Sequence, residues 1–153
     1  MKHITYLFIC LLFVLSSCDE CELLRTSTNL AGAWDLTETT QILTCESDHS
    51  FDTTFVFNDT LSTVCTLKQD GSCFVNFGAD TAIVGTWAVN SRKLNVDAKY
   101  VHFDLLWSRE YTIQKLTSKQ LILNNRRDIL MRESAHAIPI TLLMNETTKF
   151  IKQ

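Results

Sequence analysis

The chain has 153 residues, a length that suits one domain, and its 14 basic and 17 acidic side chains give a net charge of −3. We expect no nucleic-acid partner, because the basic stretch NNRRD around Arg126 and Arg127 is not interleaved with the aromatic stacking residues of a nucleic-acid groove. Acidic side chains predominate over residues 18–91 and basic ones over residues 92–153, so we expect the two halves to attract each other across a folded domain.

Residues 1–17 have the composition of a secretory signal peptide. Lys2 and His3 precede the apolar run ITYLFICLLFVL, which ends in small residues. This run is shorter than the ~20 residues that a transmembrane helix needs. We therefore expect a chain that is exported without spanning the membrane.

The signal ends in LSSCDEC, from Leu15 to Cys21. Its first four residues resemble, at every position, the lipobox L-[AS]-[GAS]-C of bacterial lipoproteins. The resemblance implies cleavage before Cys18 and acylation of that residue, and more than one acyl chain holds a protein stably on a membrane. It also implies an envelope location on the outer membrane of a Gram-negative cell. The acids that follow Cys18 resemble a signal for export to the cell surface, so the protein would face either the periplasm or the exterior. The alternative is an ordinary signal peptide, with Cys18 as a disulfide partner.

Residues 18–29 are the expected lipidated tether. Four cysteines remain outside the signal and the anchor: Cys21, Cys45, Cys65 and Cys73. The turn at Asp70 and Gly71 brings Cys65 and Cys73 close together, which makes them the first candidates for a disulfide, although only some turn geometries allow the bond. The other two cysteines would then pair by exclusion. The alternative is four free, buried thiols.

From about residue 30 onward, the pattern is one of strands and turns. Stretches rich in β-branched and aromatic residues recur about every ten residues: FDTTFVFN, LSTVCTL, SCFVNFG, GTWAVN, KLNVD, REYTIQKL and KQLILNN. Helical periodicity is confined to residues 22–28 and to DLLWSRE around Trp107. Regular short strands predict an antiparallel sheet, and about eight of them can close into a barrel without exposed edges. We therefore expect an all-β, up-and-down barrel over residues 30–153.

The stretch NLAGAWDLTETT, with Leu30, Gly32 and Trp34, resembles the opening G-x-W strand of lipocalin-like domains in small bacterial lipoproteins. LKQDGSCFV, VGTWAVNSRKLNV, YTIQKLTSKQLIL and ETTKFIKQ resemble later strands of that family in the same order. The resemblance implies a lipocalin-like barrel of about eight strands. Gly32 would let the chain bend into the sheet, and Trp34 would close one end of the barrel. A ligand would then enter at the opposite end.

An eight-stranded barrel is either filled by its own side chains or holds one small ligand. The alternation of apolar and polar residues along the strands predicts six inward residues, which are the ligand-lining candidates: Phe55, Phe57, Phe74, Trp87, Tyr111 and Ile113. A one-residue error in register would exchange the two faces of a strand. Trp107 is either a core residue or a rim residue for a ligand or partner. The basic stretch around Arg126 and Arg127 could bind an anion.

Enzyme chemistry has little support in this sequence. There is no G-x-S-x-G elbow, no H-E-x-x-H motif and no phosphate-cradling glycine loop. His102 and Asp104 would share a strand face, but no third partner can be named for them. We therefore expect no catalytic residue, no metal site and no cofactor.

The leading hypothesis is a membrane-anchored barrel that binds a small apolar or amphipathic molecule, or that displays its loops to an envelope partner. The first alternative is a protease inhibitor, because LAGAW followed by a cysteine also resembles small barrel inhibitors of bacterial metalloproteases. Such an inhibitor would insert residues 19–29 into the enzyme. The second alternative is a structural envelope subunit with a packed core.

Overall fold

The computed structural model describes residues 26–45, 49–78, 80–102, 105–131 and 140–153. The signal peptide, the lipidation site Cys18 and the candidate disulfide partner Cys21 lie outside these residues. Residues 26–30 are helical. The remaining elements are β1 (Gly32–Thr44), the 3-10 helix η1 (His49–Phe51), β2 (Thr53–Asn58), β3 (Thr63–Leu67), β4 (Ser72–Phe77), β5 (Asp80–Asn90), β6 (Lys93–Tyr100), β7 (Leu106–Leu116), β8 (Gln120–Met131) and β9 (Ile140–Lys152).

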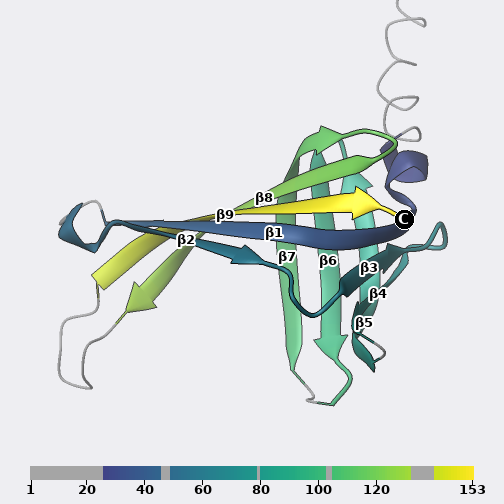
Figure 1. The fold of residues 1–153 in the computed structure, drawn as a ribbon, viewed down its shortest axis with the longest axis horizontal. Coiled ribbons are helices and arrows are strands. Elements are labelled where there is room, and N and C mark those ends of the chain that lie inside the picture. The colour runs from purple at the N-terminus through teal and green to yellow at the C-terminus, as the bar shows by residue number, and fades with distance from the viewer. Residues whose placement is uncertain (1–25, 46–48, 79, 103–104, 132–139) are drawn as a thin grey trace, which may run out of the picture.

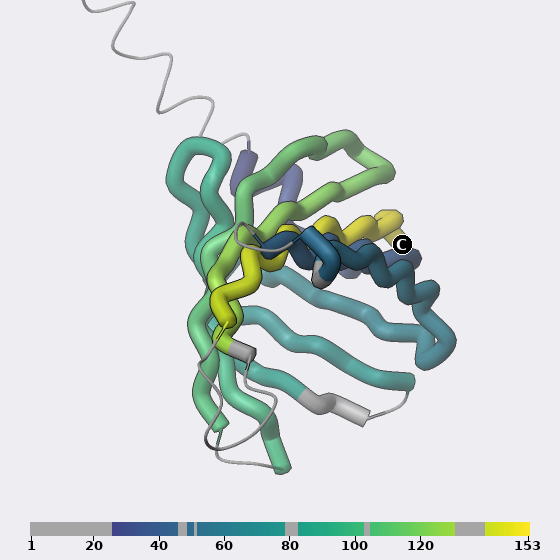
Figure 2. The backbone as a smooth tube through the Cα atoms, turned by 90° about the vertical axis from the view of Figure 1, so that its left-hand side faces the viewer, coloured from purple at the N-terminus to yellow at the C-terminus, as the bar shows by residue number. Residues whose placement is uncertain are grey.

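Eight of these strands form a closed antiparallel barrel. From β3 to β9 each strand pairs with its successor along the chain, and β1 pairs with both β3 and β9 to close the circle. The yellow β9 lies beside β1, while β5, β6 and β7 cross behind them in Figure 1, and Figure 2 shows the same strands from the side. The structure confirms the predicted fold class. Closure of the barrel pairs the backbone N–H and C=O groups that the edge strands of an open sheet would expose.

The ninth strand, β2, lies on an extension of the barrel. It pairs with β1 from Glu38 to Leu43, beyond the four residues of β1 that pair with β3. The far halves of β8 and β9 accompany it, since their ladder continues to Met131 and Ile140. Together, β2, residues 38–44 of β1, residues 126–131 of β8 and residues 140–145 of β9 form the extension, which projects to the left in Figure 1.

Two expectations from the sequence are corrected. DLLWSRE was a helical candidate, but Leu106 and the residues after it form β7. Their side chains alternate in exposure between the two faces of the sheet, which is the period of a strand. ETTKFIKQ was expected to be the last strand, and the apolar stretch HAIPITLLMNE before it was expected to cover one barrel end or to carry an additional strand, whereas β9 runs continuously over Ile140–Lys152. Its first half forms the extension instead of covering the barrel.

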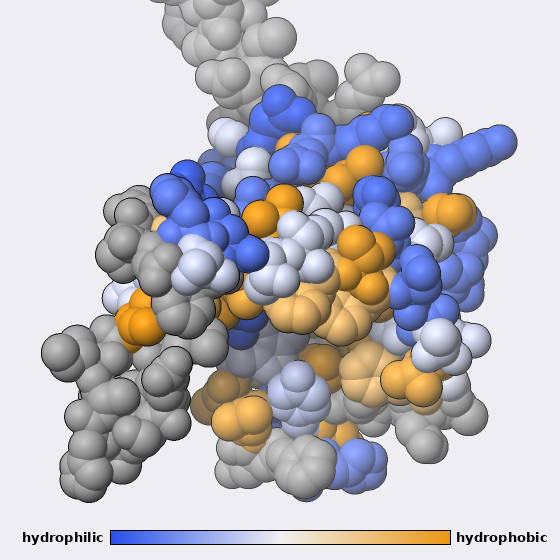
Figure 3. Space-filling model, turned by 60° about the vertical axis from the view of Figure 1, so that its left-hand side comes forward, coloured by the Kyte–Doolittle hydropathy of each residue, from blue (hydrophilic) through white to orange (hydrophobic). Residues whose placement is uncertain are grey.

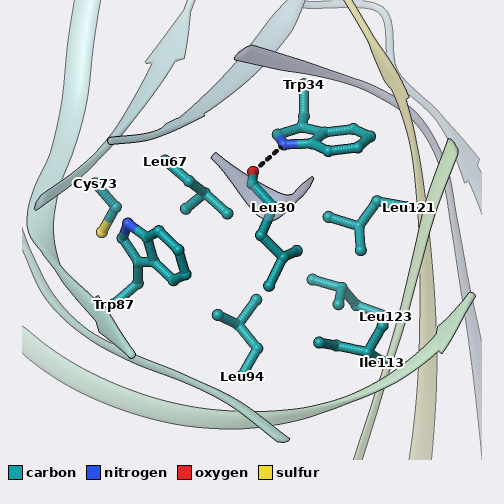
Figure 4. Packing of buried hydrophobic residues seen from close by; sticks show 9 residues of the cluster. All are labelled: Leu30, Trp34, Leu67, Cys73, Trp87, Leu94, Ile113, Leu121 and Leu123. Atoms are coloured by element: carbon teal, nitrogen blue, oxygen red, sulfur yellow. Dashed lines mark hydrogen bonds between the residues drawn. The ribbon is translucent and has the colours of Figure 1, made fainter. Parts of the chain in front are cut away.

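One end of the barrel is closed by its own core. Leu30, at the end of the short helix, is fully buried among residues from several strands (Figure 4). Trp34 is also fully buried, and its indole Nε1 donates a hydrogen bond of 2.7 Å to the Leu30 carbonyl. Lys152 lies 5.0 Å from the Trp34 ring centroid and donates to the Ala31 carbonyl. Gly32 has a φ of +140°, and a Cβ there would lie 2.7 Å from Lys152 Cε. Gly32 and Trp34 thus lie where the resemblance placed the closed end.

Candidate functional site

A cavity of about 220 Å³ lies inside the barrel, and Trp34 lines it whereas Leu30 does not. Most of its wall is apolar: Trp34, Leu36, Leu67, Val75, Ile83, Leu94, Val96, Leu121, Leu123 and Phe150 belong to it. An engineered apolar cavity of ~150 Å³ binds benzene, whereas drug-sized ligands need ~300 Å³ or more. The cavity therefore suits an apolar group or the tail of a longer molecule.

The cavity face continues onto the extension. Strand pairing places Phe57, Thr39, Thr148 and Leu123 in one row across β2, β1, β9 and β8. Thr148 and Leu123 line the cavity, and directly paired residues share a sheet face. Figure 3, turned to bring the extension forward, shows apolar side chains gathered above a hollow. The interior face is thus open to solvent on this side of the barrel.

The structure places the six predicted lining residues at different depths. Tyr111 lines the cavity. Trp87 and Ile113 are buried in the packed core, where Trp87 Nε1 donates to the Lys68 carbonyl. The prediction for Phe74 is wrong, because this ring lies on the outer face with Lys68 Nζ 4.5 Å from its centroid. Its neighbours Cys73 and Val75 are the residues of β4 that line the cavity, so alternation placed this strand one residue out of register.

Phe55 and Phe57 share the interior face but lie outside the cavity. Phe57 pairs with Thr39, and Phe55 pairs with Gln41. Their rings stack with centroids 6.2 Å apart and remain 44% and 52% exposed. Alternation therefore predicted the correct face, but it could not show that β2 lies beyond the closed part of the barrel.

The cysteines correct another expectation. Cys65 and Cys73 both lie in the interior on adjacent strands, but they are free thiols. Cys65 pairs with Val75 and Cys73 with Leu67, so the two thiols are diagonal instead of opposite. Burial raises the pKa of both thiols, to about 12 at Cys65. Cys45 is buried, and its predicted pairing with Cys21 stays a prediction.

Polar groups gather where the cavity opens. Burial and the charge of Glu146 raise the pKa of the Tyr111 hydroxyl to about 12. Glu146 accepts a 2.7 Å hydrogen bond from Gln41 Nε2, and Asn125 Nδ2 donates to the Glu110 carbonyl at 2.7 Å. The Tyr111 hydroxyl therefore stays protonated at neutral pH and can donate to a polar ligand atom.

The sequence left open whether Trp107 is a core residue or a rim residue for a ligand or partner. In the structure its side chain lines the cavity. Its indole Nε1 is buried and has no hydrogen-bond acceptor within the described part of the chain. A buried donor without an acceptor is costly, and a ligand oxygen would satisfy it. Thr148 and Glu146 were not named as site residues although both lie in ETTKFIKQ, which was expected to be a strand, because alternation alone does not show which strand face borders a cavity.

Neither a metal site nor a spanning helix is found in the described residues. No group of three or more His, Cys, Asp or Glu side chains there could hold a metal ion. His102 is exposed, and Asp104 is outside the described residues. None of the helices in the described ranges has the length and apolar character needed to cross a membrane.

Comparisons with known proteins give distant structural similarity alone. No protein-family model matches the chain, and no curated protein is similar to it in sequence. A polyisoprenoid-binding domain from Saccharophagus degradans, implicated in plant cell wall breakdown, is similar in structure with a TM-score of 0.39 and 10% sequence identity. The match covers 78% of this chain and 98% of that one. The candidate binding site of this chain therefore rests on the cavity in its own structure, and not on the comparison.

Proposed function

We propose that this chain is a lipid-anchored, lipocalin-like envelope protein that binds an apolar or amphipathic molecule in its barrel. The observation that carries the proposal is the apolar cavity of about 220 Å³, bounded by Trp34 at one end and open toward the extension at the other. Burial of hydrocarbon in such a cavity supplies the binding free energy, at ~0.8 kcal/mol per methylene group.

The amino-terminal sequence supports the membrane part of the proposal. Leu15, Ser16, Ser17 and Cys18 match the lipobox pattern at all four positions. The first described residues, 26–30, lie beside the plugged end of the barrel. A tether that joins the barrel at this end leaves the opening on the extension side uncovered by the anchor.

The binding site is tested by narrowing the cavity. Val96 lines it, so Val96→Phe would fill part of its volume. We expect unmodified straight-chain alcohols, from hexanol to dodecanol, to bind the natural chain about fourfold more tightly per added methylene until the cavity is full. Val96→Phe should weaken the binding of the longer alcohols at least tenfold. Isothermal titration of the purified chain measures both effects.

Val84→Phe is the matched control, because Val84 pairs with outward-facing Phe74 on the outer face of the sheet. It should leave the affinity for alcohols unchanged while adding the same ring. If no alcohol binds the natural chain, or if both variants behave alike, the barrel is not the binding site. The exposed Phe55 and Phe57 would then favour display of the extension to an envelope partner.

A further inference from the structure

Two arginines face the opening of the cavity. Arg109 lies between Trp107 and Tyr111 in β7, and both of these neighbours line the cavity. Because alternate residues of a strand share a face, Arg109 faces the same side. Arg127 is on the interior face of β8, where its Nη2 lies 3.9 Å from the sulfur of buried Met144. Both arginines are half-buried.

The two strands separate at this level. Pairing between β7 and β8 runs from Leu116 and Leu121 to Thr112 and Asn124. Arg109 and Arg127 lie three residues beyond that last pair, on strands that no longer share a ladder. The pair of guanidinium groups therefore borders the opening through which a ligand would reach the cavity.

The charges around this opening do not balance. Neither arginine forms an ion pair with an acid among the described residues. Arg109 and Arg127 lower the pKa of the Tyr111 hydroxyl, against the stronger effects of burial and Glu146, so all four groups share one neighbourhood. Two cations face one carboxylate, and that carboxylate is already bonded to Gln41. Among the described residues, one positive charge is therefore left in excess.

Two of the uncharged groups here can donate a hydrogen bond, and one, the buried Asn125 Oδ1, is an acceptor without a partner in the described residues. The Tyr111 hydroxyl stays protonated, and Trp107 Nε1 is buried without an acceptor in the described chain. The two guanidinium groups, the indole and the phenol outnumber this single acceptor, so they favour a ligand head group that mainly accepts hydrogen bonds. A carboxylate or a phosphate has this property, whereas an amine does not.

We propose that Arg109 and Arg127 bind the acidic head group, a carboxylate or a phosphate, of a single-chain amphiphile whose apolar tail occupies the cavity. This inference rests on the proposed function and specifies its ligand class. Planar guanidinium groups form paired, charge-assisted hydrogen bonds with such anions. The excess of one positive charge favours an anionic head over a neutral or cationic one.

The test compares head groups on one chain length. Decanoate, decyl phosphate and decan-1-ol are titrated at neutral pH into the natural chain and into Arg109→Gln, Arg127→Gln and the double variant. We expect at least one of the two anions to bind about tenfold or more tightly than the alcohol, and each single variant to reduce that preference several-fold. The double variant should bind the preferred anion and the alcohol equally.

Arg126→Gln is the matched control, since Arg126 neighbours Arg127 but is exposed on the other face. This variant should prefer the anion over the alcohol as strongly as the natural chain does. Thermal unfolding verifies that each variant is folded. Equal binding of all three probes to the natural chain, or a preference that survives in the double variant, overturns the inference while the apolar cavity stands. If no probe binds, the proposed function fails together with it. The comparison of probes on the natural chain needs no variant, so it holds even if a substitution prevents folding.

Discussion

At the residue scale, the interior of the barrel holds ionisable groups in their neutral forms. Burial raises the pKa of Cys65 from its ordinary 9.0 to about 12, and the neighbouring Cys73 adds to the effect. The pKa of the Tyr111 hydroxyl rises from 10.0 to about 12, chiefly because the group is buried. Both groups are acids that lose a proton less readily in the folded chain, because the apolar wall does not solvate a thiolate or a phenolate.

These shifts predict a loss of stability in alkali. A folded-state pKa above the unfolded value contributes stability that is complete below the unfolded pKa and is lost as pH rises toward the folded pKa. The free energy of unfolding should therefore fall between about pH 9 and 12. In Cys65→Val, which keeps an apolar side chain of similar size, the fall should be shallower. Urea unfolding at stepped pH measures both curves, and parallel curves would contradict the assignment to Cys65.

At the element scale, the barrel depends on the close approach of β5 and β6. Gly85 pairs directly with Ala98, and a Cβ at Gly85 would lie 2.6 Å from Ala98 Cα. Real Cβ contacts are essentially never shorter than 3.0 Å, and this neighbour is backbone that cannot rotate away. Gly85 therefore lets the two strands close the barrel wall next to the buried Trp87.

We expect Gly85→Ala to destabilise the fold by about 1–3 kcal/mol, the usual cost of overpacking, because β5 or β6 must shift to admit the methyl group. Thr86→Ala tests the neighbouring exposed position and should change the free energy of unfolding by less than about 0.5 kcal/mol. Chemical denaturation of both variants gives the comparison. An unchanged midpoint for Gly85→Ala would show that the two strands are free to move apart.

At the scale of the whole molecule, the acidic first half and the basic second half meet along β1 and β9. Glu38 of β1 and Lys149 of β9 form an ion pair of 2.6 Å, and Gln153 donates to Asp35 near the other end of β1. The charge difference that is visible in the sequence thus lies partly across the seam that closes the barrel. The two ends of the barrel also differ, because Leu30 and Trp34 fill one end and the cavity opens toward the extension at the other.

The predicted anchor is tested on the full chain in cells. Cys18→Ala should abolish incorporation of labelled palmitate and leave the signal uncleaved, since lipidation and cleavage both require this thiol in the lipobox interpretation. Cys21→Ala should incorporate label normally and remain in the membrane fraction. Autoradiography of fractionated cells measures both. A natural chain without label, together with normal cleavage of Cys18→Ala, would favour the ordinary signal peptide instead.

The sequence by itself determined the fold class and most strand positions. Alternation and turn spacing depend on neighbouring residues, so GTWAVN and KLNVD predicted paired strands correctly. The same reasoning assigned the inward faces of Trp87, Tyr111 and Ile113.

Only the tertiary structure decided what lies inside the barrel. Phe74 faces outward because the register of β4 is set by its pairing with β3 and β5, and Phe57 is exposed because β2 lies on the extension. Arg109 and Arg127 are distant in sequence, and the separation of β7 from β8 brings them to one opening. A cavity depends on how side chains from several strands fill a shared volume, and this long-range packing cannot be derived from local sequence patterns.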